Sequence, residues 1–263
     1  MAHKRKNFTD NQRANIYARD SAICGFSGQS LWLFDYGLRP NWDMDWADHI
    51  KPSAQGGGAD INNGICASSF FNSKKKDNSH DNVYFFKDGA VTDFYIRAYG
   101  IPSKDIMERL SRLKKLTPTD WYINRAISSV FIALDWRCHK EFFGQVKKRD
   151  DNYWFSSGWT KLQKYIKNKS SQCLVSRGLI LSPLPLGTDM LLEFQFINSH
   201  NDYLNLCEKI YPVYRENFYF WDQFIKADLS GKETIIDTAI ENESIHPELL
   251  LAVQRQFISL NLK

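Results

Sequence analysis

Cysteine is scarce in this chain, and the five that occur are widely spread. An odd number of distant cysteines does not make the disulfide framework of a small secreted protein, which favours a reducing compartment. No stretch approaches the run of about eighteen apolar residues that a membrane-spanning helix needs. Residues 1–6 and those that follow are polar where a secretory signal would have its apolar region. We therefore expect a cytoplasmic protein that has no membrane partner.

Internal repeats and low-complexity tracts are also missing, and the composition is that of a globular protein. Hydrophobic residues make up 43% of the chain and aromatic residues 14%, which is enough for a sizeable core. A chain of 263 residues can form one large domain, or a small domain followed by a second folded region. We favour the second arrangement, with a boundary near residue 100.

Positive charge is concentrated in the middle of the chain. Residues 101–170 hold 15 basic and 7 acidic side chains, whereas residues 171–263 hold 7 basic and 12 acidic ones. A phosphate backbone would be attracted to the first of these segments, although a solvated basic helix face gives the same count. Charge alone therefore does not decide in favour of nucleic acid.

The first clear local signal is for a helix over residues 10–20. Thr9 and Gln12 have the spacing of a capping box, in which the two side chains satisfy free backbone groups at the start of a helix. Arg13 and Arg19 are expected on the outer side of this helix.

A strand, a loop, a second strand and a short helix are expected to follow between residues 44 and 76. The strands are predicted over 44–50 and 62–67, with three consecutive glycines in the loop between them. Beyond residue 100, the spacing of apolar residues predicts a series of helices. They are expected over 103–116, 119–143, 157–169, 203–227 and 247–260, while 173–197 is more strand-like.

The most informative motif begins with the neighbours Asp48 and His49 and continues through the glycine loop. Asn63 follows the loop, and Asn72 opens the segment after the second predicted strand. This order resembles the HNH, or ββα-metal, nuclease family, in which an Asp-His pair, a glycine-rich loop, an Asn and a further His or Asn follow one another. The resemblance covers about residues 10–80.

Hydrolysis of a phosphodiester needs an activated water, neutralisation of the phosphate charge and help for the departing 3′ oxygen. The resemblance implies that His49, as a histidine with an ordinary pKa of about 6.5, is the general base. It also implies that Asp48 and Asn72 are the ligands of a metal ion. Two protein oxygens make an open site that suits Mg²⁺, and Mn²⁺ would substitute.

Asn63 is the second residue of this motif to which the resemblance gives a catalytic role. It would hold His49 in place through a hydrogen bond to the second imidazole nitrogen or to nearby backbone, and Asn62 is the neighbouring alternative. Because adjacent side chains on a strand point to opposite faces, Asp48 and His49 need a twisted or bulged backbone to serve one site.

The commoner form of the family has two Cys-x-x-Cys motifs that bind a structural zinc ion, and this chain departs from it. Cys24 is followed by Ser27, and Cys66 is followed by Ser69. Serine hydroxyls are poor zinc ligands, so structural zinc is not expected, and the two cysteines would lie buried beside each other. Recruitment of a distant histidine such as His80 is the alternative.

Phosphate contacts are expected from two groups of basic residues. The first directly follows Asn72, and the second lies around the apolar face of the helix predicted over 103–116. The residues are Lys74, Lys75, Lys76, Arg109, Arg112, Lys114 and Lys115. The run Lys147–Arg149 adds charge for further contact.

The sequence as a whole predicts the α+β class, with an HNH (ββα-metal) catalytic unit in residues 1–100. Residues 101–263 would form a mostly helical α+β region of unknown fold that recognises or positions DNA. The expected activity is metal-dependent endonuclease cleavage of DNA, with restriction or phage defence as a context. An RNA-cleaving, toxin-like nuclease and a non-catalytic nucleic-acid-binding module on the same scaffold are the alternatives, and a homodimer is left open.

Overall fold

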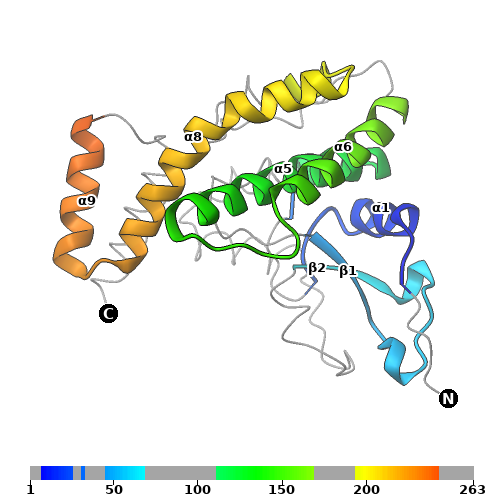
Figure 1. The fold of residues 1–263 in the computed structure, drawn as a ribbon. Helices are drawn as coiled ribbons and strands as arrows, with labels where there is room; N and C mark the ends of the chain where they lie inside the picture. Colours follow the sequence, from blue (N-terminus) through cyan, green and yellow to red (C-terminus); the bar gives the residue numbers. More distant parts are fainter. Residues whose placement is uncertain (1–6, 26–30, 33–44, 69–110, 169–192, 243–263) are drawn as a thin grey trace. The chain divides into compact units, whose positions relative to one another are not determined.

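The computed structural model describes residues 7–25, 31–32, 45–68, 111–168 and 193–242 (Figure 1). These residues belong to two compact units, of which the first runs to Arg125 and the second begins at Ala126. The boundary expected near residue 100 lies outside the described residues. The described part is mostly helical with one small antiparallel sheet, which agrees with the α+β class at this general level. None of its helices is both long and apolar enough to cross a membrane.

The first unit contains a short helix and a two-stranded sheet. Its elements are α1 (Asp10–Arg19), β1 (Asp45–His49), the 3-10 turns η2 (Ser53–Gln55) and η3 (Ile61–Asn63), and β2 (Gly64–Ser68). Strands β1 and β2 pair residue for residue, with Asp48 opposite Ile65 and His49 opposite Gly64. The chain thus runs along β1, reverses direction in the glycine loop and runs back along β2.

Helix α1 begins where the capping box predicted it. The backbone N–H of Gln12 donates to the Thr9 hydroxyl at 3.3 Å, and the Thr9 N–H donates to the Gln12 side chain at 2.8 Å. The helix buries Ala14, Ile16 and Tyr17, so its apolar side faces the protein. The expected helix and its first residue are confirmed.

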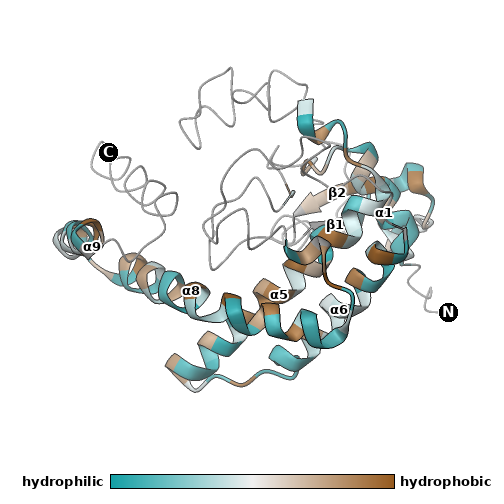
Figure 2. Ribbon diagram, turned by 90° about the horizontal axis from the view of Figure 1, so that it is seen from above, coloured by the Kyte–Doolittle hydropathy of each residue, from teal (hydrophilic) through white to brown (hydrophobic). Residues whose placement is uncertain are grey.

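The second unit is built from helices. They are α5 (Pro118–Phe143), which begins in the first unit, α6 (Asp151–Asn168), α8 (His200–Lys226) and α9 (Leu229–Asn242), with the 3-10 turn η4 (Glu193–Gln195) before α8. Hydrophilic and hydrophobic residues alternate along these helices (Figure 2), as expected when each helix buries one side. Helices α5 and α8 lie within a few residues of their predicted bounds.

Two expectations for this unit are corrected. Helix α6 begins six residues earlier than predicted, because the Asp150 carboxylate accepts the Tyr153 N–H at 3.0 Å and caps the helix there. Helix α9 was not predicted, and Gly231, a residue with low helix propensity, stands near its start. Two of those residues, Ile236 and Ala239, are buried in a small core with Phe220 and Phe224 of α8.

Candidate active site at the end of strand β1

Asp48 and His49 are the last two residues of β1, and both are largely buried. The two residues retain 8% and 7% of their full exposure, respectively. Ionisable residues are seldom buried this deeply unless they have a structural or chemical task. Pairing with β2 is one to one along β1, so the pair stands in a regular ladder without a bulge. Because neighbouring side chains of a regular strand point to opposite faces, the bulge that would bring Asp48 and His49 to one side is not found between β1 and β2.

The imidazole of His49 is held by ring stacking. Phe8 lies parallel to it, with ring centroids 4.3 Å apart and an angle of 25° between the planes. Opposite His49, Gly64 makes room for this packing, because a Cβ at Gly64 would lie 2.2 Å from Ile16 Cδ1 and 3.1 Å from Phe8 Cζ. The segment before α1 thus fixes the plane of the His49 ring.

Asn63 ties the two ends of the glycine loop together. Its Oδ1 accepts the Lys51 N–H at 2.8 Å, and its Nδ2 donates to Lys51 O at 3.1 Å and to Gly58 O at 2.8 Å. The Ile50 N–H also donates to Asn63 O at 2.8 Å, directly after His49. These side-chain bonds are to nearby backbone, one of the two partners expected for Asn63. Asn62 is exposed.

Replacement of Asn63 by alanine is expected to loosen this loop. The change removes three hydrogen bonds to backbone groups, and a loss of about 1–3 kcal/mol in the free energy of unfolding is expected. Asn62→Ala is the matched control, because a surface substitution usually changes stability by less than about 0.5 kcal/mol. Urea unfolding of both variants measures the difference, and equal stability of the two would contradict the role assigned to Asn63.

The glycine loop contains two positions that restrict side chains for different reasons. Gly56 has φ of 83°, a left-handed conformation that glycine adopts without strain. A Cβ at Gly57 would lie 1.8 Å from the carbonyl oxygen of Lys51, whereas a Cβ at Gly58 would meet no atom within 4 Å. Close approach of two backbone segments therefore demands glycine at Gly57 but not at Gly58.

Helix α1 anchors the loop and β2 through polar side chains whose partners in the loop and in β2 the sequence did not predict. Arg19 donates to Ile61 O at 2.8 Å and to Gly64 O at 2.6 Å, and Gln12 donates to Ala59 O at 2.6 Å. Asp20, the residue after Arg19, accepts the Cys66 N–H at 2.7 Å. Its hydrogen bond to the Arg19 guanidinium raises the pKa of Arg19. Arg19 was expected to face outward; its side chain is 39% exposed, but its guanidinium binds backbone.

Cys24 and Cys66 are both buried, as expected, and neither forms a disulfide bond. Their segments are joined by a hydrogen bond from the Gly25 N–H to Cys66 O at 2.8 Å. A Cβ at Gly25 would lie 2.2 Å from Ile65 Cδ1, so the two segments are closely packed. Ser27, Ser69 and His80 lie outside the described residues.

Of the two expected metal ligands, Asp48 is the one that lies within the described residues. Asn72, the second expected ligand, lies outside the described residues, and the described ranges contain no group of three or more His, Cys, Asp and Glu that could hold a metal ion. The donor set still fits the expected ion in one respect, because the Asp48 carboxylate is the ligand type that a hard cation such as Mg²⁺ prefers.

The expected phosphate-binding residues divide into three groups. Lys114 and Lys115 are exposed, as expected of a surface contact. Arg112 is only 7% exposed, which removes it from the exposed basic face predicted for 103–116. The helical residues of this segment end at Leu113, which is buried next to Arg112, so this end of the segment is covered by protein. Lys74, Lys75, Lys76 and Arg109 lie outside the described residues.

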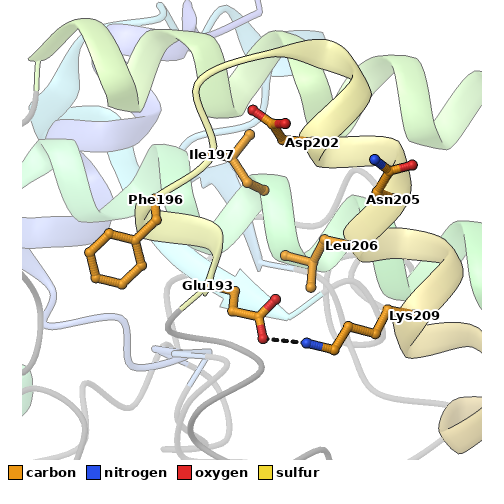
Figure 3. Close-up of a pocket in the computed structure, with 7 residues that line it drawn as sticks. All are labelled: Glu193, Phe196, Ile197, Asp202, Asn205, Leu206 and Lys209. Carbon is orange, nitrogen blue, oxygen red and sulfur yellow. Dashed lines mark hydrogen bonds and ion pairs between the residues drawn. The ribbon is translucent and has the colours of Figure 1, made fainter.

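A pocket of about 340 Å³ in the second unit offers no comparable chemistry (Figure 3). It is lined by Glu193, Phe196, Ile197, Asp202, Asn205, Leu206 and Lys209. Glu193 and Lys209 form an ion pair at 2.6 Å, and Asp202 accepts the Ser199 N–H at 3.0 Å as part of the α8 cap. Its charged side chains are therefore engaged in holding η4 and the start of α8.

A second titratable cluster lies between α5 and α8. Tyr214 donates to Asp135 at 3.3 Å, and His139 Nε2 lies 3.5 Å from the other Asp135 oxygen. Burial raises the pKa of Asp135 to about 7 and lowers the pKa of His139. The rings of Trp136, Phe143 and Phe218 lie around His139, so this is a partly buried polar cluster in an aromatic setting.

No protein-family model, curated protein or solved structure matches this chain. Its function is therefore inferred from its own residues.

Proposed function

We propose that the protein is a metal-dependent endonuclease of the HNH (ββα-metal) type that hydrolyses phosphodiester bonds in DNA. The supporting observation is the end of β1, where buried Asp48 and His49 adjoin a tight loop that the Asn63 side chain closes. The antiparallel strands, the loop and the order of these residues agree with the first two elements of such a centre. The proposal includes a third element, a helix that would carry Asn72.

Each residue of the proposed active site has its own task in the reaction. Neutral His49 accepts the proton of the water whose oxygen attacks phosphorus, and the bond to the 3′ oxygen breaks. Phe8 keeps the imidazole plane fixed during this transfer. Asp48 and Asn72 would hold Mg²⁺, which when bound neutralises charge on the phosphate and the leaving oxygen. The leaving oxygen takes a proton from solvent, so the products carry a 3′-hydroxyl and a 5′-phosphate.

Asp48→Asn is expected to raise the Mg²⁺ concentration required for cleavage. The change keeps the shape of the side chain but removes the negative charge that attracts the ion. Asp60→Asn is the matched control, because Asp60 caps η3 through an oxygen that asparagine also supplies. The measurement is the cleavage rate as a function of Mg²⁺ for both variants. Identical titration curves for wild type and Asp48→Asn would remove Asp48 from the ligand set.

The substrate class is tested by offering duplex DNA and tRNA side by side. Supercoiled plasmid should be nicked in Mg²⁺ or Mn²⁺ and remain intact in EDTA, while tRNA survives under the same conditions. Preferential loss of tRNA would overturn the assignment in favour of an RNA-cleaving nuclease. Binding of both without cleavage would instead support a non-catalytic module on this scaffold.

A further inference from the structure

Positive charge in the second unit is concentrated on α6 and on the turn before it. Residues 144–168 contain six basic and two acidic side chains, whereas α8 and α9 together contain four basic and seven acidic ones. Among the described residues of the second unit, this turn and this helix therefore carry the excess of positive charge.

The two acidic residues of this segment are engaged in local structure. Asp150 caps α6 by accepting the Tyr153 N–H at 3.0 Å, and Asp151 binds the Arg137 guanidinium at 3.3 Å. The cations of the turn lie over aromatic rings, with Lys147 Nζ 4.0 Å from the centre of Trp136 and Arg149 Cζ 5.1 Å from the centre of Tyr153. Exposed positive charge is therefore left available to an external anion.

Helix α6 presents a fixed outer face next to this turn. It buries Phe155, Leu162 and Tyr165, and between them Gly158 makes a close contact in which a Cβ would lie 2.4 Å from the Tyr203 hydroxyl. The side chains on its exposed positions include no acid. They are Asn152, Tyr153, Ser156, Thr160, Gln163 and Lys167.

Helix stability explains only part of this charge pattern. Lysines in the last turns of α6 are favoured by the negative end of the helix dipole. The run Lys147–Arg149 precedes the positive end of the same helix, where the dipole favours anions. The exposed cations of this run are therefore unfavourable next to the positive end of the helix dipole. Both the helix start and these cations attract an anion.

We propose that residues 144–150 and the exposed face of α6 form a surface that binds the phosphate backbone of duplex DNA. Lys147, Lys148 and Arg149 contact phosphates at one end of the helix, and Lys167 does so at the other. The hydroxyls of Tyr153 and Ser156 lie on the face between them and are of the kinds that donate to phosphate oxygens. None of its residues has a role in the proposed cleavage reaction, and the proposed surface goes beyond that reaction.

The experiment measures binding without cleavage, so it is independent of the nuclease assignment. Anisotropy of a fluorescent duplex is recorded in EDTA over a range of salt concentrations, with the full chain and with K147Q/K148Q/R149Q. Each lost phosphate contact should reduce the slope of log affinity against log salt by about one, and the triple change should weaken binding by roughly tenfold or more. The side chains are exposed, so circular dichroism and melting should be nearly unchanged.

A matched triple variant, K209Q/K226Q/K232Q, removes the same charge from α8 and α9. It should keep both the affinity and the slope of the wild type. Equal losses in the two variants would overturn the proposal, because net charge alone would explain them. An unaltered slope in K147Q/K148Q/R149Q, or equal binding of polyglutamate or of phosphatidylserine vesicles, would overturn it as well. Lys148→Gln alone, with an expected slope change of about one, serves as the second variant should the triple change disturb the fold.

Discussion

His49→Ala is expected to lower the rate of DNA cleavage by about two to four orders of magnitude, the usual contribution of a general base. Water would then have to lose its proton without the imidazole that stands at the end of β1. Binding should be nearly intact, because removal of the imidazole leaves the basic surface unchanged. Single-turnover cleavage of a labelled duplex at saturating Mg²⁺ measures the first effect, and anisotropy in EDTA measures the second.

Loss of the stacked ring could also reduce stability, so two further variants accompany His49→Ala. His49→Gln keeps much of the side-chain volume against Phe8 and should be as slow as the alanine variant. His200→Ala removes an exposed histidine in α8 and should cleave at the wild-type rate. Wild-type cleavage by both His49 variants would exclude His49 as the base.

Gly57→Ala is expected to reduce both stability and cleavage, although Gly57 has no direct role in the reaction. Gly58→Ala is the control. A Cβ at Gly57 would overlap the Lys51 carbonyl at 1.8 Å, and neither of the two backbone segments can move without breaking the Asn63 bonds. Forced overpacking of this kind costs about 1–3 kcal/mol. We also expect cleavage to fall by roughly a hundredfold, the size of effect that about 1 Å of misplacement produces at an active site.

Gly58→Ala should leave both stability and cleavage close to wild type, because a Cβ there meets no atom within 4 Å. Urea unfolding and single-turnover cleavage of the two variants form the comparison. Should Gly57→Ala and Gly58→Ala behave alike, the tight loop would have no part in positioning Asp48 and His49.

Local signals in the sequence predicted the elements of the first unit well. The capping box of Thr9 and Gln12 placed the start of α1, and the segments around Asp48 and Cys66 form strands as expected. These signals act within a few residues, where spacing and hydrogen bonding are fixed by local geometry. Much of the fold near the candidate site could therefore be predicted.

Contacts between distant segments could not be predicted in the same way. Phe8 stacks on His49, and Arg19 binds the carbonyls of Ile61 and Gly64, over separations of about forty residues. Neither periodicity nor capping signals carry such information. One signal was available for Gly64, since a glycine inside a strand often marks the close approach of another segment.

The buried state of Arg112 shows a different limit. Its position among basic residues suggested an exposed face, but Arg112 is buried beside Leu113 at the end of the helical segment. A count of charges does not reveal which face of a helix is covered. The run Lys147–Arg149 was expected to add contact from its charge alone, and the bonds of Asp150 and Asp151 show in addition that its acidic neighbours are engaged in local structure.

The most direct measurement of the central claim is the chemistry of the DNA ends that the wild-type protein leaves. An end-labelled duplex is incubated with the purified full chain in Mg²⁺, and the products are tested for extension by a polymerase and for ligation. The account predicts metal-dependent products with 3′-hydroxyl and 5′-phosphate ends and no product in EDTA. A duplex that the protein binds but leaves intact in both Mg²⁺ and Mn²⁺ would contradict it.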